Sequence, residues 1–316
     1  MENNYLGQTG IKVSKMCFGA LTVGPLQKNL SPKEGGRVIE YAFNKGVNFI
    51  DTAEMYESYE HIRQGLKAFN RSDVVIASKS YAYNKQGAEK AVYDALKALN
   101  TDYLDVFLMH EQESVHTIRG HYEALETYIR LKEKGVIRAV GLSTHHVAGV
   151  EAAIKYDEIE VIHPILNVSG LGIVDGSRDQ MYEKIQSFKK KGGGVFSMKP
   201  LGGGNLLNRI EDSFDYVLSL DGIDSIALGM QNTLEVDYNV ARFNQEPIDG
   251  SVRQALKGQR RDLHIADWCT GCGACLKRCH QEALYIEGDK ARVKKDLCVL
   301  CGYCATVCPD FCIKVV

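Results

Sequence analysis

The stretch Val47-Asn-Phe-Ile-Asp51-Thr-Ala-Glu-Met-Tyr56 decides the fold, because an apolar run ends on a carboxylate and a phenol follows five residues later. Its valine, phenylalanine and isoleucine favour extended backbone, so the run predicts a buried strand of a parallel sheet with Asp51 at its carboxyl end. Catalytic residues of α/β folds gather at that end of the strands. Asp51 and Tyr56 are therefore candidate catalytic residues.

Two later apolar runs also end on an ionisable side chain. Val74-Val-Ile-Ala-Ser-Lys79 ends on a lysine, and Tyr103-Leu-Asp-Val-Phe-Leu-Met-His110 ends on a histidine. The carboxyl ends of parallel strands share one edge of a sheet, so Lys79 and His110 are expected beside Asp51 and Tyr56.

These four side chains predict proton transfer at a carbonyl or alcohol oxygen. A free tyrosine is a poor acid at neutral pH, since its pKa is about 10. A nearby Lys79 ammonium favours the phenolate, and the Asp51 carboxylate keeps that ammonium charged and oriented. Tyr56 then gives or takes a proton, while a neutral His110 donates a hydrogen bond to the same oxygen. This set suits hydride addition to a carbonyl, or hydride removal from an alcohol.

Taken singly, each residue has a simpler interpretation. An aspartate after a strand often caps the next helix, and a lysine there is usually a solvated charge. Together the four resemble the catalytic tetrad of the aldo-keto reductase family, which has an Asp and a Tyr after the second strand, a Lys after the third and a His after the fourth. The resemblance implies catalytic roles for Asp51, Tyr56, Lys79 and His110.

The chain of 316 residues is long enough for one barrel-sized domain and a small appendage. Alternating patterns over about 245 residues predict a (β/α)8 TIM barrel, preceded by a short hairpin. The expected strands cover residues 15–21, 48–51, 74–78, 106–110, 139–143, 161–166, 195–199 and 225–229. The expected helices cover residues 32–45, 57–69, 87–99, 119–134, 146–155, 179–191, 211–220 and 233–243. A doubly wound sheet is the alternative, but no Gly-x-Gly-x-x-Gly follows the first strand.

The family resemblance also implies a set of residues that bind the nicotinamide cofactor. They are Ala20, Ser143, Thr144, His163, Met198, Lys199, Pro200, Leu201, Gly202, Gly229, Gln231, Glu235 and Asn239. Three of them depart from the family pattern: Thr144 replaces an Asn, His163 stands where a Gln is usual, and Met198 replaces an aromatic ring. Backbone amides of the glycine run 202–204 could line a pyrophosphate, although such a run also serves as flexible loop filler.

The expected adenosine end of the cofactor carries no cation in this sequence. NADP-preferring members place cationic side chains there, where this chain has Gln231 and Glu235. A carboxylate beside a phosphate is repulsive. Either NAD is slightly favoured over NADP, or nicotinamide binding is weak.

Nine of the ten cysteines lie between Cys269 and Cys312, in a chain whose start lacks the features of a signal peptide. Clustered Cys-x-x-Cys spacing in that context indicates metal rather than disulfides. The run is Cys269-x2-Cys272-x2-Cys275-x3-Cys279, and it recurs as Cys298-x2-Cys301-x2-Cys304-x3-Cys308-Pro309.

This is the bacterial two-cluster ferredoxin pattern, in which three thiolates hold one cluster and the fourth holds the other. The first 4Fe-4S cluster would take Cys269, Cys272, Cys275 and Cys308, and the second would take Cys298, Cys301, Cys304 and Cys279. Two zinc knuckles are the alternative, since paired Cys-x-x-Cys also binds zinc. Cys312 matches Ala283 of the first repeat and is expected to fill a packed position.

The predicted domains are the barrel at residues 1–246, a partly helical linker at 247–267 and a small α+β ferredoxin-like domain at 268–316. The linker cations, Arg253, Lys257, Arg260 and Arg261, are expected to be solvated rather than to form a binding patch.

A net charge of −2 gives no electrostatic case for nucleic acid, and no apolar run is long enough to span a membrane. A cytoplasmic protein is expected.

Two functions fit these observations. The first is an oxidoreductase that exchanges hydride between NAD(P) and a small carbonyl or alcohol, with clusters that are structural or connect to a ferredoxin-like or flavoprotein partner. The second is an electron-transfer protein whose barrel no longer performs nicotinamide chemistry. Hydride carries two electrons and each cluster passes one, so direct exchange between them requires a flavin or another carrier. No flavin motif is present.

Overall fold

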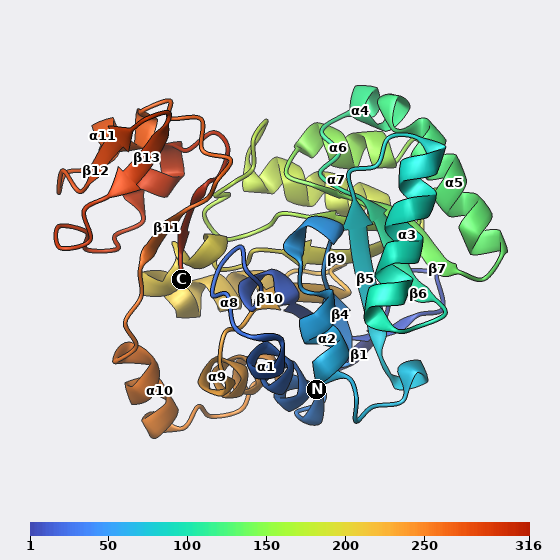
Figure 1. The fold of residues 1–316 in the computed structure, drawn as a ribbon, viewed down its shortest axis with the longest axis horizontal. Helices are drawn as coiled ribbons and strands as arrows, with labels where there is room; N and C mark the ends of the chain where they lie inside the picture. The colour runs from blue at the N-terminus through green and yellow to red at the C-terminus, as the bar shows by residue number, and fades with distance from the viewer.

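Eight parallel strands close into a barrel in the computed structural model, which describes residues 1–316 (Figure 1). Hydrogen-bonded neighbours follow the order β10-β3-β4-β5-β6-β7-β8-β9, and β9 pairs with β10 to complete the ring. The strands are β3 (Met16–Gly19), β4 (Phe49–Asp51), β5 (Val75–Ser80), β6 (Leu104–Met109), β7 (Ile137–Thr144), β8 (Val161–Pro164), β9 (Gly194–Met198) and β10 (Ser225–Gly229). The predicted TIM barrel is confirmed.

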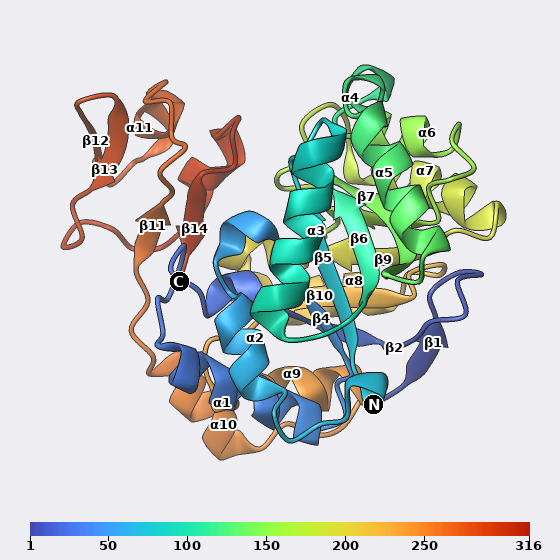
Figure 2. The same cartoon turned by 45° about the vertical axis from the view of Figure 1, so that its right-hand side comes forward.

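Helices between successive strands form the outer layer of the barrel (Figures 1 and 2). They are α1 (Pro32–Asn44), α2 (Tyr59–Gly65), α3 (Lys85–Leu99), α4 (Val115–Gly120), α5 (Tyr122–Glu133), α6 (Val147–Ala153), α7 (Arg178–Lys190), α8 (Ile210–Leu218) and α9 (Thr233–Phe243). The helix expected at 119–134 corresponds to α5 but begins three residues later, because His121 leaves helical geometry and separates α4 from α5. No helix in the structure has both the length and the apolar character needed to cross a membrane.

An N-terminal hairpin lies against the end of the barrel where the strands begin. Its strands, β1 (Asn3–Tyr5) and β2 (Lys12–Ser14), pair antiparallel, and the chain then enters β3 directly. Leu6 and Ile11 of this hairpin are fully buried. The hairpin does not cover the opposite end of the barrel, where the strands finish and the candidate site lies.

The C-terminal part forms a small α+β unit beside the barrel (Figure 2). Between α9 and this unit lies α10 (Gly250–Lys257), which packs against α9. The elements of the unit are β11 (Leu263–Ile265), α11 (Ala274–Arg278), β12 (Leu284–Glu287), β13 (Lys290–Val293) and β14 (Ile313–Val315). β12 pairs with β13, and β11 pairs antiparallel with β14. Part of the expected linker is therefore helical, and another part, β11, pairs with the last strand of the chain.

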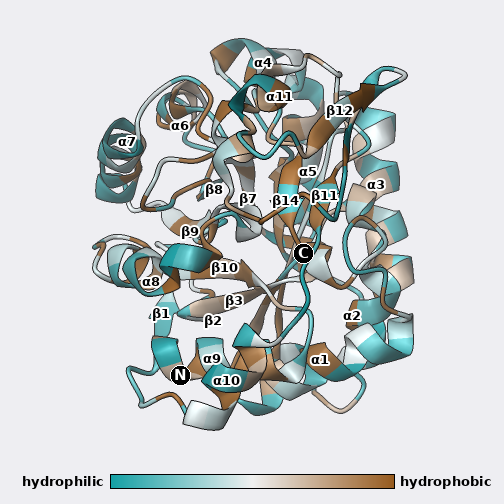
Figure 3. Cartoon of the chain, turned by 90° about the vertical axis from the view of Figure 1, so that its left-hand side faces the viewer, coloured by the Kyte–Doolittle hydropathy of each residue, from teal (hydrophilic) through white to brown (hydrophobic).

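The last strand, β14, packs against a loop of the barrel. In Figure 3 the C-terminus lies in front of the barrel, above α9 and α10. Asn205 Nδ2 donates to the carbonyl oxygen of Ile313 at 2.9 Å. The glycines at 202–204 all have positive φ, and a Cβ at Gly204 would overlap the carbonyl oxygen of Val315. These glycines therefore permit the close approach of the C-terminal strand.

The tight contact between β7 and β8 yields a test of the barrel. A Cβ at Gly141 would overlap the carbonyl oxygen of Val161. Overpacking costs about 1–3 kcal/mol, so Gly141→Ala is expected to lower the thermal unfolding midpoint by about 2–10 °C. The matched control is Gly120→Ala, which has open space around the new methyl group and should leave the midpoint unchanged or raise it. Equal midpoints for the two variants, measured by circular dichroism, would contradict this packing.

Candidate active site and cluster sites

The four predicted catalytic residues meet at the carboxyl ends of three adjacent barrel strands. Asp51 is the last residue of β4, and Tyr56 follows in a short 3-10 helix. Lys79 lies near the end of β5, and His110 follows β6. Because β4, β5 and β6 are neighbours in the barrel, the structure brings all four side chains together.

A buried ion pair forms the base of this group. Lys79 Nζ lies 2.7 Å from Asp51 Oδ1 and 2.8 Å from Oδ2, and it donates to the carbonyl oxygen of Thr52 at 2.7 Å. Burial by itself would raise the pKa of Asp51, but the Lys79 charge, with His163, lowers this pKa to about 2. The carboxylate is therefore ionised at neutral pH and holds the ammonium in place.

The hydroxyl of Tyr56 lies 3.4 Å from His110 Nε2, and the two rings meet edge to face. Burial, followed by the Asp51 charge, raises the pKa of Tyr56 well above its ordinary value. The structure thus differs from the expected tuning, in which Lys79 favours the phenolate. Burial, followed by the Lys79 charge, lowers the pKa of His110 well below its ordinary value. At neutral pH the site holds a protonated phenol beside a neutral imidazole.

Two further residues support His110, and the sequence argument did not single them out. The ring of Tyr81 stacks on His110 with centroids 4.3 Å apart, and its hydroxyl donates to Glu111 Oε2 at 2.5 Å. Tyr81 lies two residues beyond Lys79, and Glu111 directly follows His110. The sequence feature that could have identified them is their position, since both residues lie just beyond the end of a strand.

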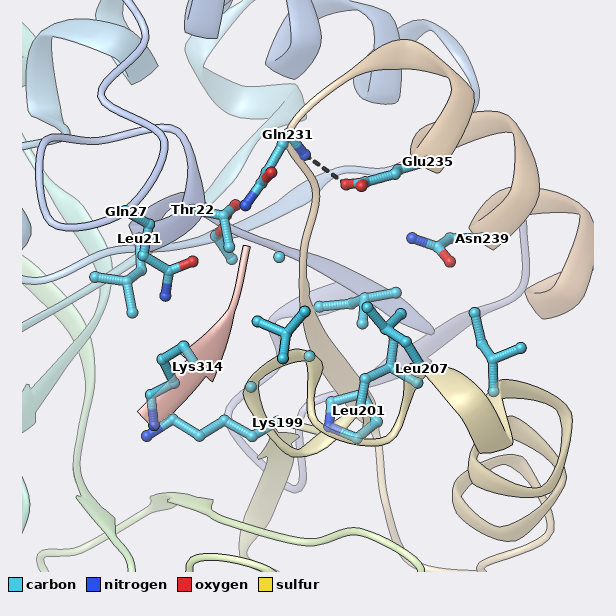
Figure 4. A pocket seen from close by; sticks show the side chains of 18 of the residues that line it. Leu21, Thr22, Gln27, Lys199, Leu201, Leu207, Gln231, Glu235, Asn239 and Lys314 are labelled. Carbon is cyan, nitrogen blue, oxygen red and sulfur yellow. Dashed lines mark hydrogen bonds between the residues drawn. The ribbon is translucent and has the colours of Figure 1, made fainter. Parts of the chain in front are cut away.

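A cavity of about 600 Å³ is lined by Asp51 and Tyr56 and by residues of α9. Figure 4 shows the part of it near α9, with Glu235 and Asn239. Nine of the thirteen predicted cofactor residues line it: His163, Met198, Lys199, Pro200, Leu201, Gly229, Gln231, Glu235 and Asn239. Ala20, Ser143, Thr144 and Gly202 do not line it. The Ser143 hydroxyl accepts from the Glu111 N–H and the Thr144 hydroxyl accepts from the His146 N–H, both at 2.9 Å. Both hydroxyls thus bind the protein's own backbone.

His163 lies between the barrel core and Asp51. Its Nδ1 donates to the carbonyl oxygen of Phe196 at 2.6 Å, and its ring stacks on the Phe196 ring. Its Nε2 lies 3.6 Å from Asp51 Oδ2. The position expected to contact a carboxamide therefore also faces the tetrad carboxylate.

Segments outside the barrel strands supply unexpected parts of the cavity wall. Lys314 and Val315 come from β14, and Arg253, Lys257 and Arg261 come from the expected linker. These linker cations were expected to be part of a linker and not of a binding patch, but three of the four line the cavity, because the chain after α9 passes the cavity before it enters the C-terminal unit.

One of these cations neutralises the carboxylate at the α9 end. Arg261 Nη2 lies 2.9 Å from Glu235 Oε1, and the Gln231 N–H donates to Glu235 Oε2 at 2.8 Å. Arg253 is also engaged, because its Nη1 lies 3.0 Å from Glu211 Oε1. Lys257 lines the same cavity and forms no ion pair.

The eight predicted cluster ligands line two small cavities in the C-terminal unit. The first cavity is lined by Cys269, Cys272, Cys275 and Cys308, with Cys312 also in its wall. The second is lined by Cys279, Cys298, Cys301 and Cys304. The structure therefore groups the thiols as the crossed assignment predicts.

The surroundings of these thiols suit metal-bound sulfur. The backbone N–H groups of Ala291, Ala283 and Cys312 donate to the sulfurs of Cys269, Cys279 and Cys308 at 3.2–3.4 Å. Hydrogen bonds to ligand sulfurs are a usual feature of iron-sulfur sites. No group of three or more His, Cys, Asp or Glu side chains is arranged to hold a single metal ion. A 4Fe-4S cluster requires no such convergence, because its four thiolates bind four different irons.

Both parts of the chain match known families. The aldo/keto reductase family matches residues 15–227. The chain belongs to this family. A 4Fe-4S dicluster domain matches residues 268–312. These matches confirm the resemblance, the barrel, the oxidoreductase class and the iron-sulfur domain expected from the sequence.

Named relatives and solved structures agree with this membership. The chain is 25% identical over 302 residues to L-galactose dehydrogenase of Arabidopsis thaliana, covering 81% of this chain and 92% of that protein. It is 29% identical over 172 residues to methylglyoxal reductase of Escherichia coli strain K12, covering 51% of this chain and 61% of that reductase. An aldo-keto reductase of Bacillus halodurans, solved in its holo form, shares the fold with a TM-score of 0.65 and 21% identity over 81% of this chain and 95% of its own.

The two cysteine cavities predict the metal content of single variants. The anaerobically purified protein is expected to contain about eight irons and eight sulfides. Cys308→Ala removes a ligand of the first cluster and should lower the iron content by up to about half. Cys312→Ala is the matched control: its thiol points to the carbonyl oxygen of Asp310, so the iron content should stay unchanged. Equal iron loss in the two variants, or stoichiometric zinc without labile sulfide, would contradict the assignment.

Proposed function

We propose that this protein transfers hydride between a nicotinamide dinucleotide and a small carbonyl or alcohol substrate. The observation that carries the proposal is the convergence of Asp51, Tyr56, Lys79 and His110, of which Asp51 and Tyr56 line a cavity of about 600 Å³. The names of two relatives, L-galactose dehydrogenase and methylglyoxal reductase, support a sugar or small aldehyde as substrate class.

Each residue of the candidate tetrad has its own role in proton transfer. Tyr56 is protonated at neutral pH, so it donates the proton that a carbonyl oxygen requires as it becomes an alcohol. The neutral His110 ring lies 3.4 Å from the Tyr56 hydroxyl and is within reach of the same oxygen. The Lys79 ammonium lies 4.8 Å from the centre of the Tyr56 ring, and Asp51 holds it there.

The cavity suits a dinucleotide in one orientation. Its tetrad end would take the nicotinamide beside Met198, and its α9 end would take the adenosine beside Gln231 and Asn239. When bound, the nicotinamide supplies or accepts the hydride. The protein surrounds this cavity with apolar side chains such as Leu201 and Leu207, which exclude water from the reacting atoms (Figure 4).

We also propose that the two clusters pass single electrons to or from an external redox partner, of ferredoxin or flavoprotein type. Cys272 of the first set and Cys301 of the second set are both exposed. Each predicted cluster therefore has a ligand at the protein surface, through which a partner could exchange electrons with it. A flavoprotein would reconcile one-electron transfer at the clusters with two-electron transfer at the nicotinamide.

The choice between NAD and NADP depends on the charges at the α9 end. Arg261 and Arg253 are each paired with a glutamate, and the Glu235 carboxylate itself lines the cavity. Three further cations, Lys257 in the cavity wall and Lys28 and Arg260 beside Gln231, form no ion pair, but all three are exposed. Water and salt screen exposed charges, so these cations attract a phosphate only weakly. We therefore propose that NAD is slightly favoured, as the sequence suggested.

NADH is accordingly expected to bind at least as tightly as NADPH. Glu235→Gln should shift the preference toward NADPH by about tenfold, because Arg261 loses its carboxylate partner and the repulsion of a 2′-phosphate is removed. Glu133→Gln, an exposed position without an ion pair, is the matched control and should change neither affinity. Fluorescence titration with both cofactors measures the effect. A wild-type protein that prefers NADPH would contradict the cofactor assignment.

Tyr56→Phe tests the catalytic proposal, because it keeps the ring and removes the proton. Turnover of an active substrate, found by screening sugars, aldehydes and hydroxy acids, should fall by about 10²- to 10⁴-fold. Cofactor affinity and iron content should stay unchanged. Tyr83→Phe is the matched control, since Tyr83 is exposed and forms no hydrogen bond. Full activity in Tyr56→Phe would favour an electron-transfer protein whose barrel performs no nicotinamide chemistry.

A further inference from the structure

Two lysines from different parts of the chain meet inside the cavity. Lys199 directly follows β9 of the barrel, and Lys314 is the central residue of β14. Both line the cavity that also contains Asp51 and Tyr56. Figure 4 shows the two side chains extending in the same direction, and both ammonium groups lie over one ring, 5.0 and 3.0 Å from the centroid of Phe311.

Neither ammonium has a carboxylate partner. Lys199 Nζ donates to His145 Nε2 at 2.7 Å, and Lys314 Nζ donates to the carbonyl oxygen of Phe311. Lys314 is only 5% exposed. Burial lowers the pKa of Lys199 to about 8, and burial followed by the Lys199 charge lowers the pKa of Lys314. Two neighbouring cations, one buried and the other half-buried, are costly unless an anion joins them.

The surroundings hold Lys314 in this position. A Cβ at Gly203 would lie 2.6 Å from Lys314 Cδ, so the glycine provides the passage for the lysine stem. Gly203 also has a φ of 64°, a conformation that side chains other than glycine rarely adopt. The Phe311 ring lies under both charges, with its centroid 3.0 Å from Lys314 Nζ and 5.0 Å from Lys199 Nζ. The arrangement is therefore built into the interface between the barrel and the C-terminal unit.

We propose that Lys199 and Lys314 together bind one oxyanion in this cavity, either a phosphate group of the dinucleotide or a carboxylate carried by the substrate. This inference rests on the proposed function for the identity of the ligand. An oxyanion between the two ammonium groups replaces their mutual repulsion with two charge-assisted hydrogen bonds. The iron-sulfur domain thereby supplies one wall and one charge of the barrel's binding site.

The test uses the full chain, purified anaerobically with its clusters, and two variants that keep the apolar stem, Lys199→Met and Lys314→Met. Lys190→Met, at an exposed position at the end of α7, is the matched control. Inorganic pyrophosphate represents the phosphate, succinate represents the carboxylate, and NADH represents the whole cofactor. Calorimetry and fluorescence measure the three affinities.

Loss of one charged hydrogen bond is expected to weaken binding by about 10- to 100-fold. If the ligand is the cofactor phosphate, both variants lose affinity for pyrophosphate and NADH. If it is the substrate carboxylate, both lose affinity for succinate while NADH binding stays the same. In either case Lys314→Arg should recover part of the loss, and Lys190→Met should match the wild type.

The proposal is overturned if the wild type binds none of the three ligands more tightly than the two variants do. Iron content and circular dichroism show whether each variant is folded. Should Lys314→Met lose its clusters, Lys199→Met, on the barrel, still decides the question. These titrations need no turnover, so a failure of hydride transfer would refute the proposed function without affecting this result.

Discussion

The buried ion pair between Lys79 and Asp51 is the interaction on which the rest of the candidate site depends. Two charges in a protein interior cost several kcal/mol each unless they lie close together and are hydrogen-bonded. The register between β4 and β5 brings the two charges this close together. Asp51 pairs with Ala77, and Lys79 projects from the same face of β5 two residues nearer the rim. A slip of one residue between β4 and β5 would turn Lys79 to the other face.

The barrel and the iron-sulfur unit share a wall rather than only a covalent connection. β14 packs on the glycines at 202–204, and its side chains enter the cavity. Cys308, a predicted ligand of the first cluster, lies five residues before this strand. The same short segment thus connects the first cysteine set to the cavity wall. The glycines at 202–204, for which a pyrophosphate loop and flexible loop filler were both considered, also allow the close approach of β14.

The predictions that the structure or the comparisons confirm depended on local patterns. Strand ends placed Asp51, Lys79 and His110 together, because parallel neighbours in a barrel finish at the same rim. The duplicated cysteine spacing sorted eight thiols into two sets, because each set is held by one compact repeat and a single residue of the other. The positions of Ser143 and Thr144 relative to the cavity were not visible in a local pattern: their hydroxyls accept from neighbouring backbone N–H groups, and neither residue lines the cavity.

The sequence by itself indicated the order of strands and helices, the four candidate tetrad residues and the grouping of eight thiols into two sets, because hydrophobic period and residue spacing act over short stretches of chain. Only the tertiary structure decided which distant segments complete the cavity. Arg261 reaches Glu235, and Lys314 reaches Lys199, across separations that no local pattern encodes. The tertiary structure also decided the protonation of Tyr56, since the pKa of a phenol depends on burial, and burial is set by packing from every side.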